Sequence, residues 1–380
     1  DTDWLDVRRR LVNVLFGVKD GRLPARRKPD AVVLSFEDQV FGNCLCATRG
    51  LCPASACAKQ VKVRRLVWTI KVPVNDTYTI ALNSTALLSF NTSGLAPDNE
   101  PPSSVIWPEV SIAPNGEGDT LVIYHNGHGQ PCTQEGCSLD QDGTIDWLNR
   151  LGYDTLHMFM PLYQCNHDPS IGCDHAWFDQ FLEQGAPVFR LFLEPVVLAI
   201  NYAIETLGYR RVVLIGLSGG GWTTTLAAAI DPRIMLSLPV AGSIPCDFRH
   251  ESWDFEQYCD HRWAQVANYT SLYVLAALER GRASVQMLHE ADNCCFHTCH
   301  RHERIREYNT WVRSQIEGGF VTSATAGNMH EVNDRDKVVI ASLIERFRAN
   351  GKVSPSDLIA LPFNLLAQPE ADQPLTQHVI

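Results

Sequence analysis

A serine within a glycine-rich segment is the feature of this sequence best suited to covalent chemistry. Residues 216–220 read Gly-Leu-Ser-Gly-Gly, a G-x-S-x-G pattern with Ser218 at its centre. The apolar run at 212–215 predicts a buried strand before it, and the Ala- and Thr-rich segment 222–230 predicts a helix after it. A serine on a sharp turn between strand and helix has an exposed hydroxyl, and small neighbours leave room for the turn. Ser218 is therefore predicted to be a nucleophile, with a plain glycine–serine turn as the alternative.

A histidine and an acid that could activate this serine follow later in the chain. A serine hydroxyl is a weak nucleophile at neutral pH, so it needs a base and an anion that orients the base. His330 lies between a predicted strand, 320–324, and the last predicted helix. Asp292 is the orienting acid that we favour after the predicted strand 284–288, and Glu290 is the alternative. We expect His330 to act as general base and then as general acid.

The elements that must hold these residues follow from the order of apolar patterns. Strands and helices alternate across residues 120–348, which predicts a parallel sheet with helices on both faces. Two strand-like runs between residues 65 and 90 predict an antiparallel edge at which the sheet begins. Residues 1–20 have helical spacing of apolar side chains, and residues 21–60 are expected to be irregular.

The serine turn and its two partners resemble the α/β-hydrolase superfamily over about residues 60 to 350. The segment GLSGGGWTT is similar to the corresponding segment in a group of secreted, esterase-like serine hydrolases. This resemblance implies an α/β-hydrolase fold with a mostly parallel central sheet, helices on both faces and the chain order serine, acid, histidine. It also implies a lid inserted after the sixth strand, at about residues 242–270.

The same resemblance implies an oxyanion hole. The backbone N–H of Gly219 is the expected first donor, because it directly follows the nucleophile. The segment HNGHG at 125–129 follows a predicted strand and is similar to the loop that supplies the second donor. We expect that donor to be Gly127 or His128, with Gln130 as a further candidate, and a glycine turn with incidental histidines is the alternative.

Aromatic residues of the expected lid have two readings that we weigh equally. They could form an apolar wall for the substrate, or they could be the lid's own small core. The three residues are Trp253, Phe255 and Trp263.

The composition limits the domain organisation and the partners. We divide the chain into an N-terminal cysteine-rich extension (1–60), a catalytic domain (61–350) and a C-terminal tail (351–380). The net charge of −11 argues against a nucleic-acid partner, and no apolar run reaches the roughly 18 residues of a membrane span. We expect no cofactor and no metal, and the oligomeric state stays open.

Cysteines and glycosylation sequons favour an oxidising compartment. The chain has 13 cysteines and begins at Asp1, as a mature form would after loss of a signal peptide, although a trimmed chain would look the same. We expect a secreted or lumenal glycoprotein with sequons at Asn75, Asn83, Asn91 and Asn268. The local cysteine pairs suggested by spacing are Cys132/Cys137, Cys165/Cys173 and Cys246/Cys259.

Two cysteine-rich segments could in principle bind zinc. One holds Cys44, Cys46, Cys52 and Cys57, and the other holds Cys294, Cys295, His297, Cys299, His300 and His302. In an oxidising compartment disulfides are the better expectation for both.

Together these features predict a secreted serine hydrolase. Carboxylic-ester hydrolysis is the leading expectation, with a small-molecule or polymeric ester as substrate. A peptidase or amidase of the same fold is one alternative, and a non-catalytic binding or adhesion protein is the other.

Overall fold

The protein is described by a computed structural model. The described residues are 2–40, 58–89, 119–128, 138–140, 143–249, 254–299 and 301–364.

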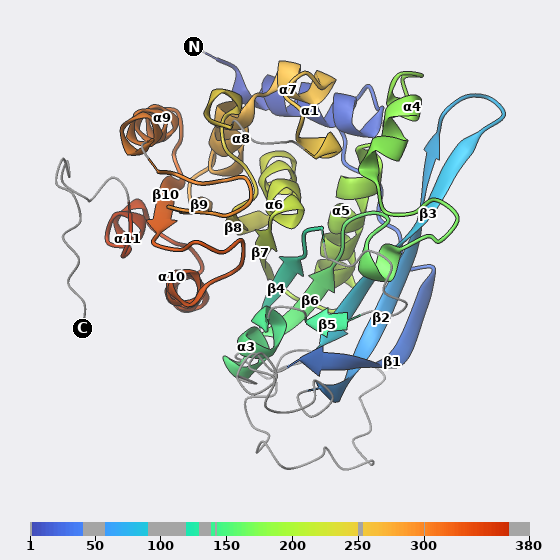
Figure 1. The fold of residues 1–380 in the computed structure, drawn as a ribbon, viewed down its shortest axis with the longest axis horizontal. Coiled ribbons are helices and arrows are strands. Elements are labelled where there is room, and N and C mark those ends of the chain that lie inside the picture. The colour runs from blue at the N-terminus through green and yellow to red at the C-terminus, as the bar shows by residue number, and fades with distance from the viewer. Residues whose placement is uncertain are drawn as a thin grey trace.

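A single sheet runs through the described part of the chain (Figure 1). Its strands are β1 (Ala31–Val40), β2 (Ala58–Pro73), β3 (Thr79–Ser89), β4 (Thr120–His125), β5 (Ser138–Asp140), β6 (Asp154–Met158), β7 (Arg211–Leu217), β8 (Ile234–Val240), β9 (Ala283–His289) and β10 (Gly319–Thr325).

The strand order in the sheet is β10-β9-β8-β7-β4-β6-β3-β2-β1-β5. In the order given, the strands from β10 to β6 pair in parallel. The pairs β6–β3, β3–β2 and β2–β1 are antiparallel, and the short β5 pairs in parallel with β1 at the edge. The predicted antiparallel start of the sheet is thus confirmed. The winding changes direction between β4 and β7, because the chain moves from β4 to β6 on one side and from β7 to β8 on the other. Ligands of open α/β sheets bind outside the carboxyl ends of the strands at such a point.

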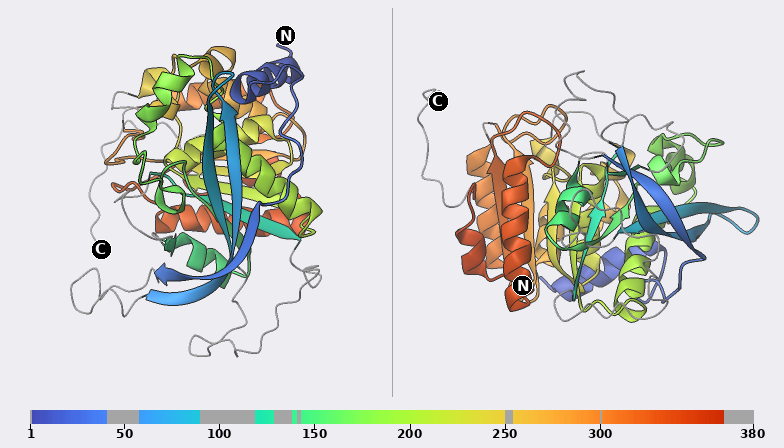
Figure 2. Two further views of the ribbon diagram at one scale, coloured as in Figure 1. Left: turned by 90° about the vertical axis from the view of Figure 1, so that its right-hand side faces the viewer. Right: turned by 90° about the horizontal axis from the view of Figure 1, so that it is seen from below.

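The helices form layers on the two faces of the sheet. In Figure 1, α3 and α10 lie on one side, and α5, α6 and α8 lie on the other with α1 and α7 outside them. Figure 2 shows the same layers from two further directions. The α-helices are α1 (Trp4–Phe16), α3 (Thr144–Arg150), α4 (Asp179–Leu182), α5 (Arg190–Glu205), α6 (Gly219–Ile230), α7 (Arg262–Val266), α8 (Tyr269–Ala276), α9 (His302–Ser314), α10 (Asp334–Asn350) and α11 (Pro355–Ile359). Short 3₁₀ turns are η2 (Gln164–Asn166), η3 (His175–Phe178), η4 (Cys246–Phe248) and η5 (Phe255–Gln257).

The central strands and α6 form the deepest part of the core. Every residue of β9, β10 and α6 is buried. Strands buried on both faces carry continuous apolar runs, and this is the pattern that predicted a parallel sheet covered by helices. The position of the turn between β7 and α6 therefore depends on apolar packing along the sheet.

The N-terminal helix is part of the same packed body. Leu11 and Leu15 of α1 are fully buried. Arg8 donates from Nε to the carbonyl of Ala229 at 2.9 Å and pairs with the carboxylate of Glu279. The predicted irregular segment 21–60 differs from the structure, since it contains β1 and the first residues of β2. The division into an extension, a catalytic domain and a tail stays a prediction.

None of the helices in the described parts of the chain has the length and apolar character that crossing a membrane requires.

Candidate active site

Ser218 lies at the sharp turn between β7 and α6. Its backbone has φ 58° and ψ −126°, a left-handed conformation that a non-glycine residue rarely adopts. The N–H of Ser218 donates to the carbonyl of Val240 at 3.0 Å, and this bond ties the turn to the end of β8. The surrounding sheet thus stabilises a conformation that an isolated chain would avoid. This is the strand–turn–helix geometry that the G-x-S-x-G pattern predicts.

The glycines of the pattern are required by close backbone contacts. A Cβ atom on Gly216 would lie 2.2 Å from the carbonyl oxygen of Gly220. A Cβ atom on Gly220 would lie 2.0 Å from the carbonyl oxygen of His125, at the end of β4. Both contacts are backbone contacts that cannot relax by a rotamer change. The two glycines therefore let α6 begin directly against β4 and β7.

Asp292 and His330 form a hydrogen-bonded pair on the loops that follow β9 and β10. Nδ1–H of His330 donates to Oδ2 of Asp292 at 2.8 Å. The other oxygen of Asp292 accepts the backbone N–H groups of Cys294 at 2.7 Å and Cys295 at 3.1 Å. Burial by itself would raise the pKa of Asp292, but these hydrogen bonds outweigh it and hold the pKa below its ordinary value. Asp292 is therefore an anion fixed against the imidazole.

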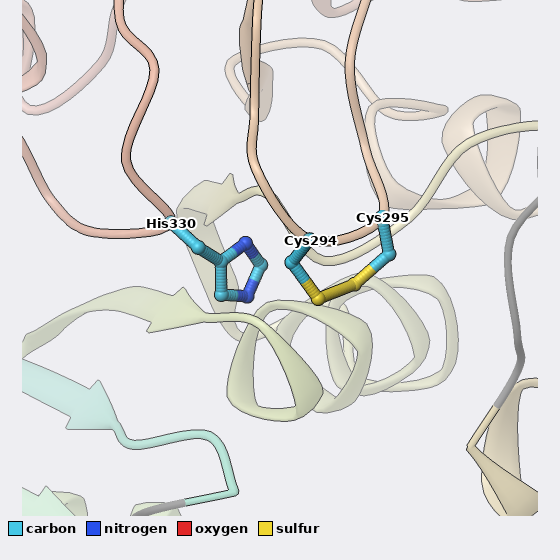
Figure 3. Close-up of side chains that lie close together, drawn as sticks. All are labelled: Cys294, Cys295 and His330. Atoms are coloured by element: carbon cyan, nitrogen blue, oxygen red, sulfur yellow. A yellow bond between two sulfur atoms is a disulfide. The ribbon is translucent and has the colours of Figure 1, made fainter.

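The remaining nitrogen of His330 is buried without a partner. Nε2 makes no hydrogen bond to the part of the chain that the structure describes. It is therefore not hydrogen-bonded to the hydroxyl of Ser218 in this structure. Catalytic hydrogen bonds are often long in the absence of substrate and shorten when it binds. In Figure 3 His330 lies beside a disulfide between Cys294 and Cys295, over the turn that leads into α6.

A second buried histidine–aspartate pair lies behind Asp292. Nε2 of His289 donates to Oδ2 of Asp336 at 2.7 Å, and both side chains are fully buried. Nδ1 of His289 is 3.9 Å from Oδ2 of Asp292. Burial alone would lower the pKa of His289, but the carboxylates of Asp336 and Asp292 raise it. This pair was not predicted from the sequence, although His289 ends the strand before Asp292 and that position could have indicated it.

The loop after β4 packs directly on the serine turn. A Cβ on Gly127 would lie 2.7 Å from the Cβ of Ser218. The N–H of Gly127 donates to the side chain of Asn126 at 3.1 Å, so this group is already engaged. Within the described residues, the N–H groups of His128 and Gly219 have no such acceptor. Of the predicted oxyanion donors, Gly219 and His128 therefore remain available. Gln130 lies outside the described residues.

The side chain of His128 belongs to a buried polar cluster. Its Nε2 is 3.1 Å from Nδ1 of His175 and 3.5 Å from a carboxylate oxygen of Glu256. Burial alone would lower the pKa of His128, but Glu256 and Asp254 raise it. Burial would raise the pKa of Glu256, but the two histidines hold it well below its ordinary value. His175 and Glu256 were missed in the sequence, because 81 residues separate them and neither lies in a motif.

Comparisons with known proteins give structural matches only. No protein family model matches the chain, and no curated protein matches it. Est1E from Butyrivibrio proteoclasticus is a structural match at 14% identity and a TM-score of 0.39, covering 74% of this chain and 97% of that one. A carbohydrate esterase family 15 glucuronoyl esterase from Caldicellulosiruptor kristjansonii matches at 13% identity and a TM-score of 0.42, and the match covers 93% of this chain and 86% of that one. Acetyl xylan esterase 1 from Thermoanaerobacterium sp. matches at 11% identity and a TM-score of 0.44, and the match covers 91% of this chain and 92% of that one.

The strand order and the turn at Ser218 decide the architecture. The chain has the α/β-hydrolase fold. Counted from β2 without the short β5, the sheet has the order 8-7-6-5-3-4-2-1, and the serine follows the fifth strand. The segment at 242–270 follows β8, the sixth strand of this count, as predicted.

Two of the three residues that were predicted to bind a substrate lie in the core. Phe255 is 4% exposed and Trp263 is fully buried. The ring of Phe255 stacks on Phe189 at 5.9 Å, and Trp263 packs edge-on against Trp222 at 6.0 Å. This burial supports the second of the two readings, a core role, because neither ring faces solvent. Trp253 lies outside the described residues.

The disulfides of the described residues include one predicted pair. Cys246 and Cys259 are bonded across the insertion after β8. Cys165 and Cys173 are both disulfide-bonded, and Cys299 is free and exposed. The Cys294–Cys295 disulfide agrees with the expectation that this segment forms disulfides. The predicted pair Cys132/Cys137, the cysteines between residues 44 and 57, and His300 lie outside the described residues.

A surface groove borders the histidine's loop. Its volume is about 1050 Å³, and Trp147, Arg150, Met329 and Arg335 are among its lining residues, which come from α3, α10 and the loop between β10 and α10. Ser218 is not among them. The groove therefore lies beside the loop of His330 and does not enclose the serine.

Proposed function

We propose that this chain is a serine hydrolase that cleaves carboxylic esters through an acyl-enzyme, the chemistry of class EC 3.1.1. The observation that carries the proposal is the strained backbone of Ser218, φ 58°, at the carboxyl edge of the sheet where the Asp292–His330 pair also lies. A left-handed serine is costly unless the surrounding structure fixes it, and such strain is concentrated at functional sites.

The proposed first step is acylation of Ser218. Its hydroxyl oxygen attacks the ester carbonyl carbon while Nε2 of His330 takes the hydroxyl proton. The tetrahedral oxyanion accepts hydrogen bonds from the N–H groups of Gly219 and His128. The intermediate then collapses, the C–O bond to the alcohol breaks, and His330 returns the proton to the leaving alcohol.

The second step is hydrolysis of the acyl-enzyme. Water attacks the acyl carbonyl carbon, and His330 again takes the proton. The acid product leaves, and the proton returns to the oxygen of Ser218. Asp292 keeps the proton of His330 on Nδ1 throughout, so that Nε2 is free to accept, and its charge stabilises the imidazolium that forms.

Turnover of model esters tests this function. We would measure hydrolysis of p-nitrophenyl esters from acetate to palmitate by the wild-type protein and by Ser218→Ala. The proposal expects turnover that Ser218→Ala lowers at least about 10³-fold, and little change for the exposed control Ser314→Ala. Equal turnover by the wild-type protein and Ser218→Ala would contradict it.

Two alternatives have distinct outcomes in the same assay. A peptidase or amidase would cleave p-nitroanilides at least as well as the matching esters. A non-catalytic binding or adhesion protein of this fold would hydrolyse neither series, although it would be folded.

We also propose that the protein is a secreted glycoprotein. The sequon residues Asn75, Asn83 and Asn268 are exposed, which glycan attachment requires. Asn91 lies outside the described residues. Intact mass before and after enzymatic deglycosylation of protein secreted from eukaryotic cells tests this assignment, and an unchanged mass would contradict it.

A further inference from the structure

Three donor side chains from distant parts of the sequence converge beside the serine turn. His128 follows β4, His175 begins η3, and Glu256 lies in η5 of the insertion after β8. Nδ1 of His175 is 3.0 Å from Oε2 of Glu256 and 3.1 Å from Nε2 of His128. Nε2 of His128 is 3.5 Å from Oε1 of Glu256. Within the described residues, these three side chains form one potential ligand set.

The spacing fits a small divalent cation. Zinc binds imidazole nitrogen and carboxylate oxygen at about 2.0–2.2 Å, so two ligands of a tetrahedral ion lie about 3.4 Å apart. The three distances within the cluster, 3.0, 3.1 and 3.5 Å, are close to that separation. One ion could therefore contact all three side chains with little movement of the protein.

The hydrogen bond on the far side of the His175 ring leaves its Nδ1 available as a metal ligand. Its Nε2 is 2.7 Å from the carbonyl oxygen of Pro161, which only accepts, so this nitrogen carries the proton. In the neutral ring Nδ1 then presents a lone pair to the carboxylate of Glu256. A metal ion bound by both atoms would satisfy this lone pair and the carboxylate together. A ligand histidine held through its other N–H by a backbone carbonyl is the usual arrangement around metals.

The burial of this cluster means that the negative charge of its carboxylate must be balanced. Glu256 is completely buried, and His175 is 3% exposed. An ionised carboxylate in such a place needs a paired charge or a metal. On the other side of His128, Nδ1 is 3.7 Å from Oδ2 of Asp254, in a position to orient the ring from behind.

We propose that His128 Nε2, His175 Nδ1 and the carboxylate of Glu256 form a binding site for one divalent ion of the zinc type. Three protein ligands leave the fourth position for a water molecule. The site would connect the loop after β4 to the insertion after β8.

The proposed ion would also hold the loop that carries a proposed oxyanion donor. A Cβ on Gly219 would lie 2.8 Å from Cε1 of His128, so the ligand ring packs on the first turn of α6. Fixing that ring fixes the backbone N–H of the same residue. This role depends on the proposed function, whereas the metal site itself does not.

The neighbouring group of Cys294, Cys295 and His330 is a poorer candidate for a metal. Its sulfur atoms are bonded to each other, and Nδ1 of His330 is occupied by Asp292. Thiolates bind zinc, whereas the sulfurs of a disulfide do not supply the required charge.

Zinc binding by the full chain tests the proposal without any assay of activity. We would strip the protein with EDTA, remove the chelator and titrate it with Zn²⁺ by calorimetry, then repeat with Co²⁺ and record the visible spectrum. We expect one ion per chain and the absorption of a low-symmetry, nitrogen- and oxygen-ligated Co²⁺. Absence of saturable binding would overturn the proposal.

Variants locate the ion. His175→Ala and Glu256→Gln should each weaken Zn²⁺ binding at least about 100-fold, while His302→Ala, in the other histidine cluster, and Ser218→Ala should bind as the wild-type protein does. Circular dichroism checks that each variant is folded. Binding that survives both ligand variants, or that His302→Ala abolishes, would overturn the assignment. Normal zinc binding in a protein that hydrolyses no ester would contradict only the proposed function.

Discussion

Nδ1 of His330 lies 2.8 Å from Oδ2 of Asp292, on the loops that follow two neighbouring parallel strands. The carboxylate is buried and also accepts two backbone N–H groups, so it cannot turn away from the imidazole. The pair therefore fixes which nitrogen of His330 faces the serine turn.

Replacing this carboxylate should impair turnover with little loss of binding. Asp292→Asn keeps the size of the side chain, but it allows the proton of His330 to move to Nε2. We expect kcat to fall about 10³- to 10⁴-fold with KM nearly unchanged, measured by steady-state ester hydrolysis. Glu290→Gln is the matched control, because Glu290 was the alternative acid and makes no bond to His330. A larger loss in Glu290→Gln than in Asp292→Asn would reverse the assignment.

Gly127 should tolerate no side chain if the serine turn is the reactive centre. In Gly127→Ala the new Cβ would lie 2.7 Å from both the carbonyl oxygen of Leu217 and the Cβ of Ser218. We expect kcat/KM to fall at least about 100-fold, because such displacements near a reacting atom have effects of this size. Gly185→Ala is the control, since its Cβ meets no atom within 4 Å although its φ is +84°. That variant should lose some stability and keep its activity.

The buried pair behind the site should contribute to stability. Asp336 accepts hydrogen bonds from His289 at 2.7 Å and from the backbone N–H of Asn333 at 3.0 Å. We expect Asp336→Ala to lower the free energy of unfolding by about 3 kcal/mol in urea denaturation, because it leaves His289 buried without its partner. Replacing the exposed neighbour, in Asp334→Ala, should lower the free energy of unfolding by no more than about 1 kcal/mol. Equal effects of the two changes would argue against a structural role for the pair.

The ion pair that ties α1 to the rest of the protein should make stability depend on acid pH. Burial opposes ionisation of Glu279, but hydrogen bonds from Arg8 and Arg282 lower its pKa to about 2 from the ordinary 4.5. A lowered pKa in the folded state means that the contribution is present above pH 4.5 and is lost as the pH falls from 4.5 to about 2.

Glu279→Gln measures this contribution directly. Because the Glu279 side chain is 37% exposed, solvent screening limits the expected loss of unfolding free energy to about 1 kcal/mol at pH 7. The difference from the wild-type protein should disappear near pH 2, and the exposed control Glu183→Gln should show none at either pH. A difference that is independent of pH would contradict the assigned charge of Glu279.

Much of this architecture could be predicted from local patterns. The parallel strands are short apolar runs that are buried on both faces, and the serine turn has glycines where an added Cβ would lie within 3 Å of neighbouring backbone atoms. Asp292 and His330 could be predicted as partners because each follows a predicted strand in the chain order serine, acid, histidine, and the structure places them in hydrogen-bond contact. Chain order and strand ends are properties that a sequence displays directly.

Other features depend on contacts between distant segments, which the sequence does not display. Phe255 and Trp263 have the side chains expected of an apolar wall, and only their packing on Phe189 and Trp222 shows that they are core residues. His175 and Glu256 meet across 81 residues. The strand at 31–40 was expected to be irregular, and it pairs antiparallel with β2, a contact between segments that are separated in the chain.

Covalent labelling of the intact protein tests the central claim most directly. The protein would be treated with a fluorophosphonate, digested and mapped by mass spectrometry, with Ser218→Ala treated in parallel. The account predicts one adduct, on the peptide containing Ser218, that is absent from Ser218→Ala and much slower to form in His330→Ala. No adduct on folded wild-type protein, or an adduct on another serine that persists in Ser218→Ala, would contradict it.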